Sequence, residues 1–347
     1  MKAWVLHGIN DFRYETVEEP ALAEGEVLVA VKAAAICGSD IPRIYSAGTY
    51  SYPLIPGHEF SGVVEKTGTG VDGKWLNKRV GIYPLIPCRD CIPCREKQYE
   101  MCRHYSYLGS RRDGGFGEYV AVPADNLIEL PDNVSFQEGA MLEPMAVAVH
   151  AIRKAAPKAV DKVVICGLGT IGMLVLMFLQ EAGIRDILAI GNKEFQKQMV
   201  LKLGLSGESY FDGRDPEVEK RLAERTGGSG SDVFFECVGK NETLAQGVKL
   251  AAPGGRVCLV GNPYSGMVLD KNIYWKILRN QLTVMGTWNS SFTQDEGDDW
   301  HYVLQRLGQK QVKPAELISH VFPRRELIQG TRIMRDKTED YIKIMAV

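Results

Sequence analysis

The sequence contains no long uninterrupted apolar segment. Its first eight residues include no extended hydrophobic stretch of the kind found in secretion signals, and the longest uncharged apolar run elsewhere, Met173 to Leu179, is far too short to cross a bilayer. We therefore expect a cytoplasmic protein that has no membrane partner.

An excess of charge of either sign is also missing. The chain has 41 basic and 43 acidic residues and no basic block, so a nucleic-acid or membrane-surface partner is not expected. Internal repeats and low-complexity tracts are absent from the sequence as well. This neutrality fits an enzyme acting on a small molecule, although many binding proteins share it.

The eight cysteines do not follow a disulfide pattern. Four of them are crowded into residues 88–102, and Cys166, Cys237 and Cys258 fall in apolar, strand-like runs. Reduced thiols together with a bound metal explain this distribution better than four disulfides do.

Short strands separated by glycine and proline dominate residues 1–150, which we expect to form a compact β-rich domain. The predicted strands span residues 27–35, 61–67, 79–84 and 117–122. Ser135 and Glu138 then form a capping-box pattern ahead of an apolar helix through Leu142 to Ala151. We expect that helix to connect two domains.

Strands alternate with helical segments over residues 151–288. The predicted strands are residues 163–166, 186–190, 208–211, 232–236, 256–260 and 282–286, with turns at the glycines of 227–230 and 254–255. Six parallel strands connected in this way predict an α/β domain with a doubly wound sheet. Residues 289–347, with helices at 298–307 and 324–335 and a strand at 341–346, are expected to return to the first domain and complete it.

A glycine-rich turn joins the strand at 163–166 to an apolar helix. Gly167 would permit the tight turn, Gly169 would let the backbone approach a pyrophosphate, and Gly172 would let the helix pack closely on the strand. Helix N-termini also present free N–H groups to phosphate. A GxGxxG pattern alone is weak, but the flanking strand and helix favour dinucleotide binding here, with Thr170 and Ile171 as further cofactor contacts.

Four cysteines lie within fifteen residues of a polar loop. They are Cys88, Cys91, Cys94 and Cys102. Four thiolates at this spacing are typical of a closed tetrahedral zinc site, which has no open position and is therefore structural.

A second set of metal-ligand residue types is scattered along the chain. Cys37 follows an apolar strand, His58 and Glu59 are adjacent, and Glu143 begins the connecting helix. Each residue also has an ordinary explanation, as a core cysteine, a turn histidine, or a helix-capping carboxylate. The residue pattern alone leaves a joint site open.

Several of these motifs together resemble the zinc-dependent medium-chain dehydrogenase/reductase family over the whole chain. The matching segments are Cys37-Gly38-Ser39-Asp40, Gly57-His58-Glu59, the four-cysteine loop, Asp113-Gly114-Gly115-Phe116-Gly117-Glu118-Tyr119, Glu143-Pro144 and the glycine turn. The resemblance implies a GroES-like catalytic domain and a Rossmann domain. It also implies that Cys37, His58 and Glu143 bind a catalytic zinc ion, with Glu59 as a fourth ligand or its neighbour, and that the protein is a homodimer or homotetramer.

The resemblance further implies oxidation of an alcohol by a nicotinamide cofactor. Zinc acidifies the alcohol, hydride passes to the nicotinamide, and the hydroxyl of Ser39 passes the proton to the nucleotide ribose and on to solvent. Ser39 as a simple turn residue is the alternative. A binding protein that keeps this fold would be expected to have damaged zinc ligands, and a zinc-ribbon interaction module would be expected to have a basic surface; neither feature is present.

Within the family, the sequence around Cys37, His58 and residues 109–116 resembles the polyol dehydrogenases, especially those acting on galactitol 1-phosphate. A phosphorylated substrate needs cationic anchors, for which Arg43, Arg111 and Arg112 are the candidates. Solvated surface charge, or an arginine paired with Asp113, is an equal alternative. Trp288 and Asn289 are also candidate substrate contacts, although an aromatic residue there could equally belong to a domain interface. An unphosphorylated polyol or threonine is the alternative substrate.

The end of the second predicted strand bears on which nicotinamide cofactor is used. NAD-specific members carry a carboxylate there, but this chain has Gly191, Asn192 and Lys193, which leave space and positive charge for a 2′-phosphate. We therefore expect NADP to be preferred or both cofactors to be used, with NAD bound through Asn192 as the alternative. The remaining predicted cofactor contacts are Val260, Gly261 and Thr287.

Overall fold

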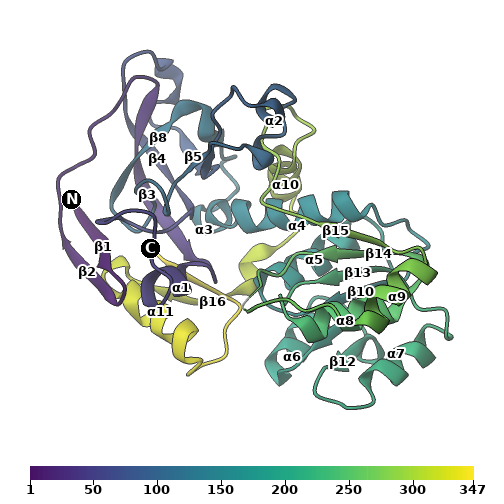
Figure 1. The fold of residues 1–347 in the computed structure, drawn as a ribbon. Helices are drawn as coiled ribbons and strands as arrows, with labels where there is room; N and C mark the ends of the chain where they lie inside the picture. Colours follow the sequence, from purple (N-terminus) through teal and green to yellow (C-terminus); the bar gives the residue numbers. More distant parts are fainter. Residues whose placement is uncertain (264) are drawn as a thin grey trace. The chain divides into compact units, whose positions relative to one another are not determined.

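The computed structural model describes residues 1–263 and 265–347 and divides the chain into two compact units. Unit 1 contains Met1–Ala146 together with Ser290–Val347, and unit 2 contains Val147–Asn289. Helix α4 (Leu142–Ala155), labelled in Figure 1, contains this boundary after Ala146, and it also contains the boundary predicted after residue 150. None of the described helices has the length and hydropathy that a bilayer crossing requires.

Unit 2 is built on a six-stranded parallel sheet, which confirms the predicted doubly wound α/β fold. Its strands are β10 (Val163–Cys166), β11 (Ile187–Gly191), β12 (Tyr210–Asp212), β13 (Ser231–Glu236), β14 (Ala251–Leu259) and β15 (Thr283–Gly286). They lie in the order β12-β11-β10-β13-β14-β15, so the order reverses between β10 and β13. In such sheets the ligand crevice lies outside the carboxyl ends of the strands at this reversal.

The connecting helices of unit 2 are α5 (Thr170–Glu181), α6 (Glu194–Lys202), α7 (Val218–Arg225), α8 (Asn241–Leu250) and α9 (Lys271–Arg279), with a short 3-10 turn η4 (Gly207–Ser209). Residues Gly172 to Leu179 of α5 are all buried. A helix that is apolar on every side belongs in the interior of a domain, and this explains the long apolar run seen in the sequence.

One prediction for unit 2 was wrong. Gly254 and Gly255 do not form a turn between elements but lie within β14, which begins five residues before the predicted strand. Gly254 has φ +73° and the register to β13 shifts nearby, so the pair marks an irregularity inside a strand. The strand predicted at 208–211 is shorter and later, because residues 207–209 form the η4 turn.

Unit 1 contains a seven-stranded sheet in which β3 is central. The strands are β3 (Glu26–Ile36), β4 (Glu59–Thr67), β5 (Arg79–Ile82), β8 (Tyr119–Pro123), β9 (Leu127–Glu129), β16 (Ile318–Phe322) and β17 (Lys343–Ala346). The last strand, β17, pairs antiparallel with the end of β3, where Ile344 lies opposite Ile36. The C-terminal segment is therefore part of this sheet.

Smaller elements complete unit 1. The strands are β1 (Lys2–Gly8), β2 (Asp11–Thr16), β6 (Leu85–Ile86) and β7 (Ser106–Tyr107); the helices are α1 (Asp40–Tyr45), α2 (Ile92–Arg95), α3 (Phe136–Ala140), α10 (Asp299–Gly308) and α11 (Leu327–Asp336); the 3-10 turns are η1 (Gly73–Trp75), η2 (Tyr99–Met101), η3 (Ala124–Asn126), η5 (Pro314–Leu317) and η6 (Arg324–Glu326). The predicted capping box is present at the start of α3, where Ser135 and Glu138 bond each other's backbone N–H groups. The helix predicted at 324–335 begins instead as η6 and continues as α11.

Candidate active site

The ends of two adjacent strands bring together three metal-ligand side chains. Cys37 follows the last residue of β3, and His58 and Glu59 lie at the start of β4, where Glu59 pairs with Ala35 across the antiparallel ladder. One potential ligand atom from each of the three side chains lies within 4.8 Å of the other two. His58 and Glu59 are buried, and Cys37 is partly buried.

Glycines fix the backbone that presents His58. Gly57 has φ +94°, and a Cβ there would lie 2.4 Å from the Phe116 ring. A Cβ on Gly114 would lie 2.0 Å from the Gly57 oxygen, so the loop containing residues 113–117 packs directly against the backbone next to His58. This close approach explains why both positions are glycine.

Asp40 controls the charge of His58. The two side chains face each other at 3.5 Å, between Nδ1 and Oδ1, but the geometry does not make a hydrogen bond, and Nδ1 is buried without a hydrogen-bond partner. Burial lowers the pKa of His58, but the charges of Asp40 and Cys37 outweigh this effect and raise the pKa well above its usual value. Asp40 also accepts a hydrogen bond from the Cys37 backbone N–H at 3.0 Å, and it forms an ion pair with Arg43.

Glu143 is buried beside this group, but it is not one of the three residues whose ligand atoms lie within 4.8 Å of one another. Burial, together with the Glu59 charge and against the opposing charge of His58, raises the pKa of Glu143 to about 7. The Tyr107 hydroxyl donates to Glu143 Oε1 at 3.3 Å, and the Tyr107 ring lies 5.8 Å from that of His58.

A buried lysine completes the cluster. Lys343 of β17 donates to Glu59 Oε2 at 2.5 Å and to the Ile36 oxygen at 3.3 Å. Lys343 and Glu59 are only 3% and 1% exposed, so this is a fully buried ion pair. It is possible because the C-terminal strand lies next to β3.

The chemistry of these donors fits a zinc ion. A thiolate, an imidazole and carboxylates are ligands that zinc accepts, and burial on strand ends holds them in place. One observation supports a cation here: the Glu143 carboxyl is buried within electrostatic reach of buried Glu59, which is itself paired with Lys343.

The four-cysteine loop also brings potential metal ligands together, and all of these ligands are sulfur atoms. Its sulfur atoms lie 3.5 Å apart for Cys91 and Cys94 and 3.9 Å for both Cys88–Cys94 and Cys91–Cys102. Zinc–sulfur bonds of about 2.3 Å in a tetrahedron place sulfur atoms roughly 3.8 Å apart. The Arg103 backbone N–H donates to Cys91 and helps lower the pKa of that thiol to about 6, which favours the thiolate.

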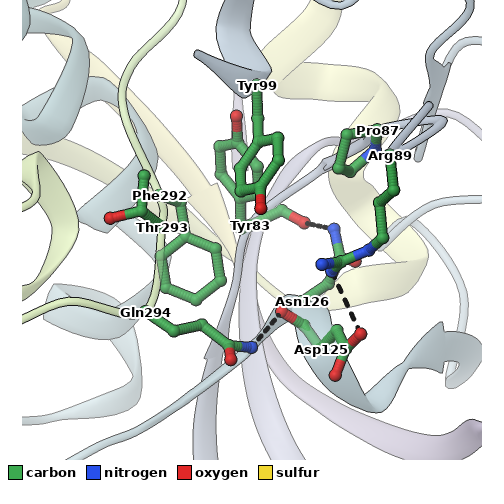
Figure 2. Close-up of a pocket in the computed structure, with 9 residues that line it drawn as sticks. All are labelled: Tyr83, Pro87, Arg89, Tyr99, Asp125, Asn126, Phe292, Thr293 and Gln294. Carbon is green, nitrogen blue, oxygen red and sulfur yellow. Dashed lines mark hydrogen bonds and ion pairs between the residues drawn. The ribbon is translucent and has the colours of Figure 1, made fainter. Parts of the chain in front are cut away.

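A small cavity lies between this loop and the returning C-terminal segment (Figure 2). Its volume is about 30 Å³, which can hold water but not a sugar alcohol. Asn126 Nδ2 donates to the Tyr83 oxygen, Gln294 Nε2 donates to the Asp125 oxygen, and Arg89 pairs with Asp125 at 3.0 Å (Figure 2). The Arg89–Asp125 ion pair connects the four-cysteine loop to η3, and the Gln294 bond connects η3 to the C-terminal segment.

A larger open cavity of about 360 Å³ begins at Ser39. It is lined by Ser39, Pro42, Arg43, Ala47, Gly48, Thr49 and Tyr50. Ser39 precedes α1, but its hydroxyl does not cap the helix. The predicted anchors differ in their surroundings: Arg43 pairs with Asp40, Arg112 pairs with Glu26 at 2.5 Å, and Arg111 stacks on aromatic rings.

In unit 2 the glycine turn has the backbone that nucleotide binding requires. Gly167 has φ +97°, and a Cβ on Gly172 would lie 1.9 Å from the Gly167 oxygen. Gly169 has no atom within 4 Å of its Cβ position, so its surface is open to a ligand. Thr170 and Ile171 are the first residues of α5.

The predicted cofactor residues of β14 and β15 lie at the carboxyl ends of those strands. The Val260 and Gly261 N–H groups both donate to the Glu236 backbone oxygen, and the Thr287 N–H donates to the Leu259 oxygen. The Glu236 side chain accepts from the Val238 and Gly239 N–H groups and from Thr243. Trp288, which is 57% exposed, and Asn289, with φ +56°, end unit 2, and their role as substrate contacts stays a prediction.

At the end of β11, Gly191 is packed while the next residues are more open. A Cβ on Gly191 would lie 2.8 Å from Leu168 Cδ1 and 3.0 Å from the Tyr210 ring. Asn192 is exposed, and its N–H donates to Gln196 Oε1. The Lys193 Nζ atom lies 5.3 Å from the Phe195 ring.

Sequence reasoning gave no role to Asp40, Tyr107, Lys343 or Glu236. Asp40 stands three residues after Cys37, and Lys343 is a single cation inside an otherwise apolar terminal strand. Those two patterns could have drawn attention to both residues. Tyr107 and Glu236 carry no comparable signal.

Two family models match the chain. One, for the alcohol dehydrogenase GroES-like domain, matches residues 23–132, and the other, for the zinc-binding dehydrogenase domain, matches residues 170–308. Among curated relatives, galactitol 1-phosphate 5-dehydrogenase of Escherichia coli K12 is 32% identical over 86% of this chain and 85% of its own length. L-threonine 3-dehydrogenase of Bacillus subtilis is 31% identical, with coverage of 91% and 90%.

Solved structures that are similar to the chain are also dehydrogenases. The chain is similar to galactitol-1-phosphate dehydrogenase from Escherichia coli, with a TM-score of 0.92 and 29% identity over 100% of both chains. It is also similar to a putative zinc-binding dehydrogenase from Sinorhizobium meliloti bound to NADP, with a TM-score of 0.90, 26% identity and coverage of 100% and 98%. A third neighbour, an alcohol dehydrogenase from Escherichia coli CFT073 complexed with NADH, has a TM-score of 0.91, 25% identity and coverage of 100% and 99%.

Proposed function

The chain belongs to the zinc-dependent medium-chain dehydrogenase/reductase family, and we propose that it oxidises a secondary alcohol of a polyol phosphate. It is an NAD(P)-linked dehydrogenase of the alcohol and polyol class. Galactitol 1-phosphate, oxidised to tagatose 6-phosphate, is the preferred substrate candidate. An unphosphorylated polyol or L-threonine is the second candidate, because a threonine dehydrogenase is among the relatives.

The observation that carries this proposal is the convergence of Cys37, His58 and Glu59 next to buried Glu143. We assign Cys37, His58 and Glu143 as ligands of the catalytic zinc, with Glu59 either a fourth ligand or held beside it by Lys343. Bound zinc polarises the substrate hydroxyl and makes its proton more acidic. The Asp40 carboxylate faces His58 Nδ1 at 3.5 Å, which is the place that second partners of metal-bound histidines generally occupy.

Ser39 is the proposed first acceptor of the substrate proton. It lies two residues after Cys37, it lines the open cavity, and its hydroxyl does not cap α1. A hydroxyl that has one proton to give and lone pairs to accept another can relay the proton outward. A bound nicotinamide would accept the hydride from the carbon that carries this hydroxyl, so that the alcohol becomes a carbonyl.

The four-cysteine site is proposed to bind a second, structural zinc ion. Four thiolates complete a tetrahedron and leave no position for substrate. The ion pair between Arg89 of the loop and Asp125 of η3 connects the loop to a neighbouring segment, which is consistent with a structural role.

We propose that the cofactor is NADP, or that both nicotinamide cofactors are used. β11 ends in Gly191 without a carboxylate of its own, and Lys193 follows. Asp212 on the adjacent strand is already bound: hydrogen bonds from the Arg214 side chain hold its pKa at about 2. Lys193 therefore offers positive charge where a 2′-phosphate is expected, whereas the Arg214 charge is already paired with Asp212.

The cofactor proposal is tested by catalytic efficiency with NADP and NAD. A preference for NAD of tenfold or more in the unmodified enzyme refutes it. Asn192→Asp places a carboxylate at an exposed position and is expected to shift preference toward NAD, as is Lys193→Ala. Asn192 suits this test better than Gly191, since a side chain on Gly191 meets Leu168 and Tyr210.

We also propose a homo-oligomer formed through unit 2. β15 is an edge strand of the sheet, and Val284 on it is 37% exposed. On α9, Trp275 and Leu278 are 46% and 50% exposed. Unpaired edges and exposed apolar side chains are features that a second copy would cover.

A cytoplasmic location stays a prediction.

The substrate is tested with purified, zinc-loaded enzyme and a matched panel. The panel contains galactitol 1-phosphate, galactitol, sorbitol and L-threonine, each with NAD and NADP. The proposal expects the highest kcat/KM with the phosphorylated hexitol. Higher efficiency with threonine or with an unphosphorylated polyol would replace it with the second candidate.

A further inference from the structure

The three arginines predicted to bind a substrate phosphate differ in whether their charge is already neutralised. Arg43 forms an ion pair with buried Asp40, and Arg112 pairs with Glu26, which is 5% exposed. Neither cation can bind a substrate anion without leaving a buried carboxylate unpaired, which is costly. Among the described residues, no carboxylate is paired with the Arg111 guanidinium.

Two tyrosines hold Arg111 instead. Its guanidinium carbon lies 4.1 Å from the Tyr50 ring centroid and 4.6 Å from that of Tyr105. Stacking on ring faces stabilises the cation without using its N–H groups, which point outward in the guanidinium plane. The result is an exposed cation that contacts two aromatic rings and whose donors remain available for a two-pronged contact with an oxyanion.

The position of this clamp connects it to the candidate active site. Tyr50 lines the same cavity as Ser39, and the Thr49 hydroxyl donates at 2.8 Å to the backbone oxygen of Ser110, the residue before Arg111. On its other side Tyr105 packs edge-on against Tyr107, with the ring centroids 6.2 Å apart. Tyr107 in turn contacts His58 and Glu143.

We propose that Arg111, clamped between Tyr50 and Tyr105, binds the phosphate group of the substrate and sets the preference for phosphorylated polyols. This inference rests on the proposed function and makes it more specific, because it assigns anion recognition to one arginine. Arg112 has a structural role in its ion pair with Glu26. A substrate bound in this way has its phosphate at Arg111 and its reacting hydroxyl toward Ser39.

The test compares identical changes at neighbouring positions. Arg111→Lys keeps the charge but loses the planar fork, whereas Arg112→Lys is the matched control that can still pair with Glu26. Arg111→Met removes the charge and keeps an apolar chain between the rings. For each zinc-loaded variant, kcat/KM is measured for the phosphorylated hexitol and for the same hexitol without phosphate, and circular dichroism verifies folding.

The expected measure is the ratio of the two efficiencies. A charge-assisted hydrogen bond contributes enough that the ratio falls about 10- to 150-fold in Arg111→Met, with a smaller fall in Arg111→Lys. The ratio stays at the unmodified value in Arg112→Lys. A ratio unchanged in Arg111→Met, or one that falls equally in Arg112→Lys, overturns the inference.

A binding measurement separates this inference from the proposed function. Calorimetric titration with the phosphorylated hexitol requires no turnover. If the unmodified enzyme oxidises neither hexitol, the proposed function fails, but weaker binding of the phosphorylated hexitol by Arg111→Met than by Arg112→Lys still supports the anion site. Equal binding by the two variants refutes that site.

Discussion

Replacing Lys343 by methionine is expected to destabilise unit 1 through the carboxylate that it leaves behind. Lys343 and Glu59 form an ion pair that is closed to solvent, with side chains 3% and 2% exposed. Methionine fills most of the lysine volume, so packing changes little and the main effect is electrostatic. Breaking one partner of a buried pair costs about 3–5 kcal/mol because the other charge stays buried and unpaired.

This cost can be expressed as a change in melting temperature. In a domain of roughly 200 residues, 1 kcal/mol corresponds to a shift of about 2–4 °C. Lys343→Met is therefore expected to melt roughly 6–20 °C below the unmodified metal-free protein. Zinc bound next to Glu59 would supply a second positive charge for that carboxylate, so the deficit is expected to be smaller in the zinc-loaded enzyme than after chelation.

A double-mutant cycle isolates the pair from other effects. Glu59→Gln removes the buried negative charge, so the double variant Lys343→Met/Glu59→Gln is expected to recover most of the lost stability in the metal-free state. Thermal and urea unfolding are measured for all four proteins with and without zinc. A single variant as stable as the parent, or a double variant no better than the single, would refute the reasoning.

The other predictions concern the metal sites, pH and assembly. Cys37→Ser is expected to lose turnover while keeping near-normal thermal stability, whereas Cys94→Ser is expected to lose chiefly stability or solubility, since metal-binding energy at a structural site is folding energy; a Cys37→Ser enzyme with ordinary turnover would contradict the active-site assignment. Because the folded-state pKa of Glu143 is raised to about 7, its stabilising contribution in the metal-free protein is complete below its unfolded pKa and is lost as pH rises through about 7. Urea unfolding from pH 4 to pH 8 should therefore show a decline that is absent from Glu143→Gln, and identical pH profiles would count against the buried, protonated carboxyl. Val284→Lys on the edge strand β15 is expected to lower the oligomeric state in analytical ultracentrifugation, and an unchanged sedimentation coefficient would exclude that edge as the interface.

The strand and helix pattern of unit 2 was predictable because local signals determine it. The six strands, the glycine turn at Gly167 and the apolar helix that follows are all encoded by neighbouring residues. The irregular register at Gly254 was not predictable, because a glycine pair inside a strand looks like a turn in the sequence. What decides between the two is pairing with β13, which is a long-range contact.

The candidate active site depends on longer-range contacts still. Residue types predicted Cys37 and His58 as ligand candidates, but no spacing rule brings Lys343 to Glu59, since 284 residues separate them. Only the pairing of β17 with β3 does so. Likewise the adjacent Arg111 and Arg112 look equivalent in the sequence.

The structure distinguishes these two arginines by their partners rather than by their position. Glu26, at the first residue of β3, neutralises Arg112, whereas two aromatic rings hold Arg111 and leave its N–H groups available. A charge in the sequence is therefore a candidate for substrate binding only until its partner is known. The same argument applies to Glu59: a carboxylate already paired with buried Lys343 gains less from zinc than an unpaired one, so Lys343 tunes how strongly Glu59 competes for the metal.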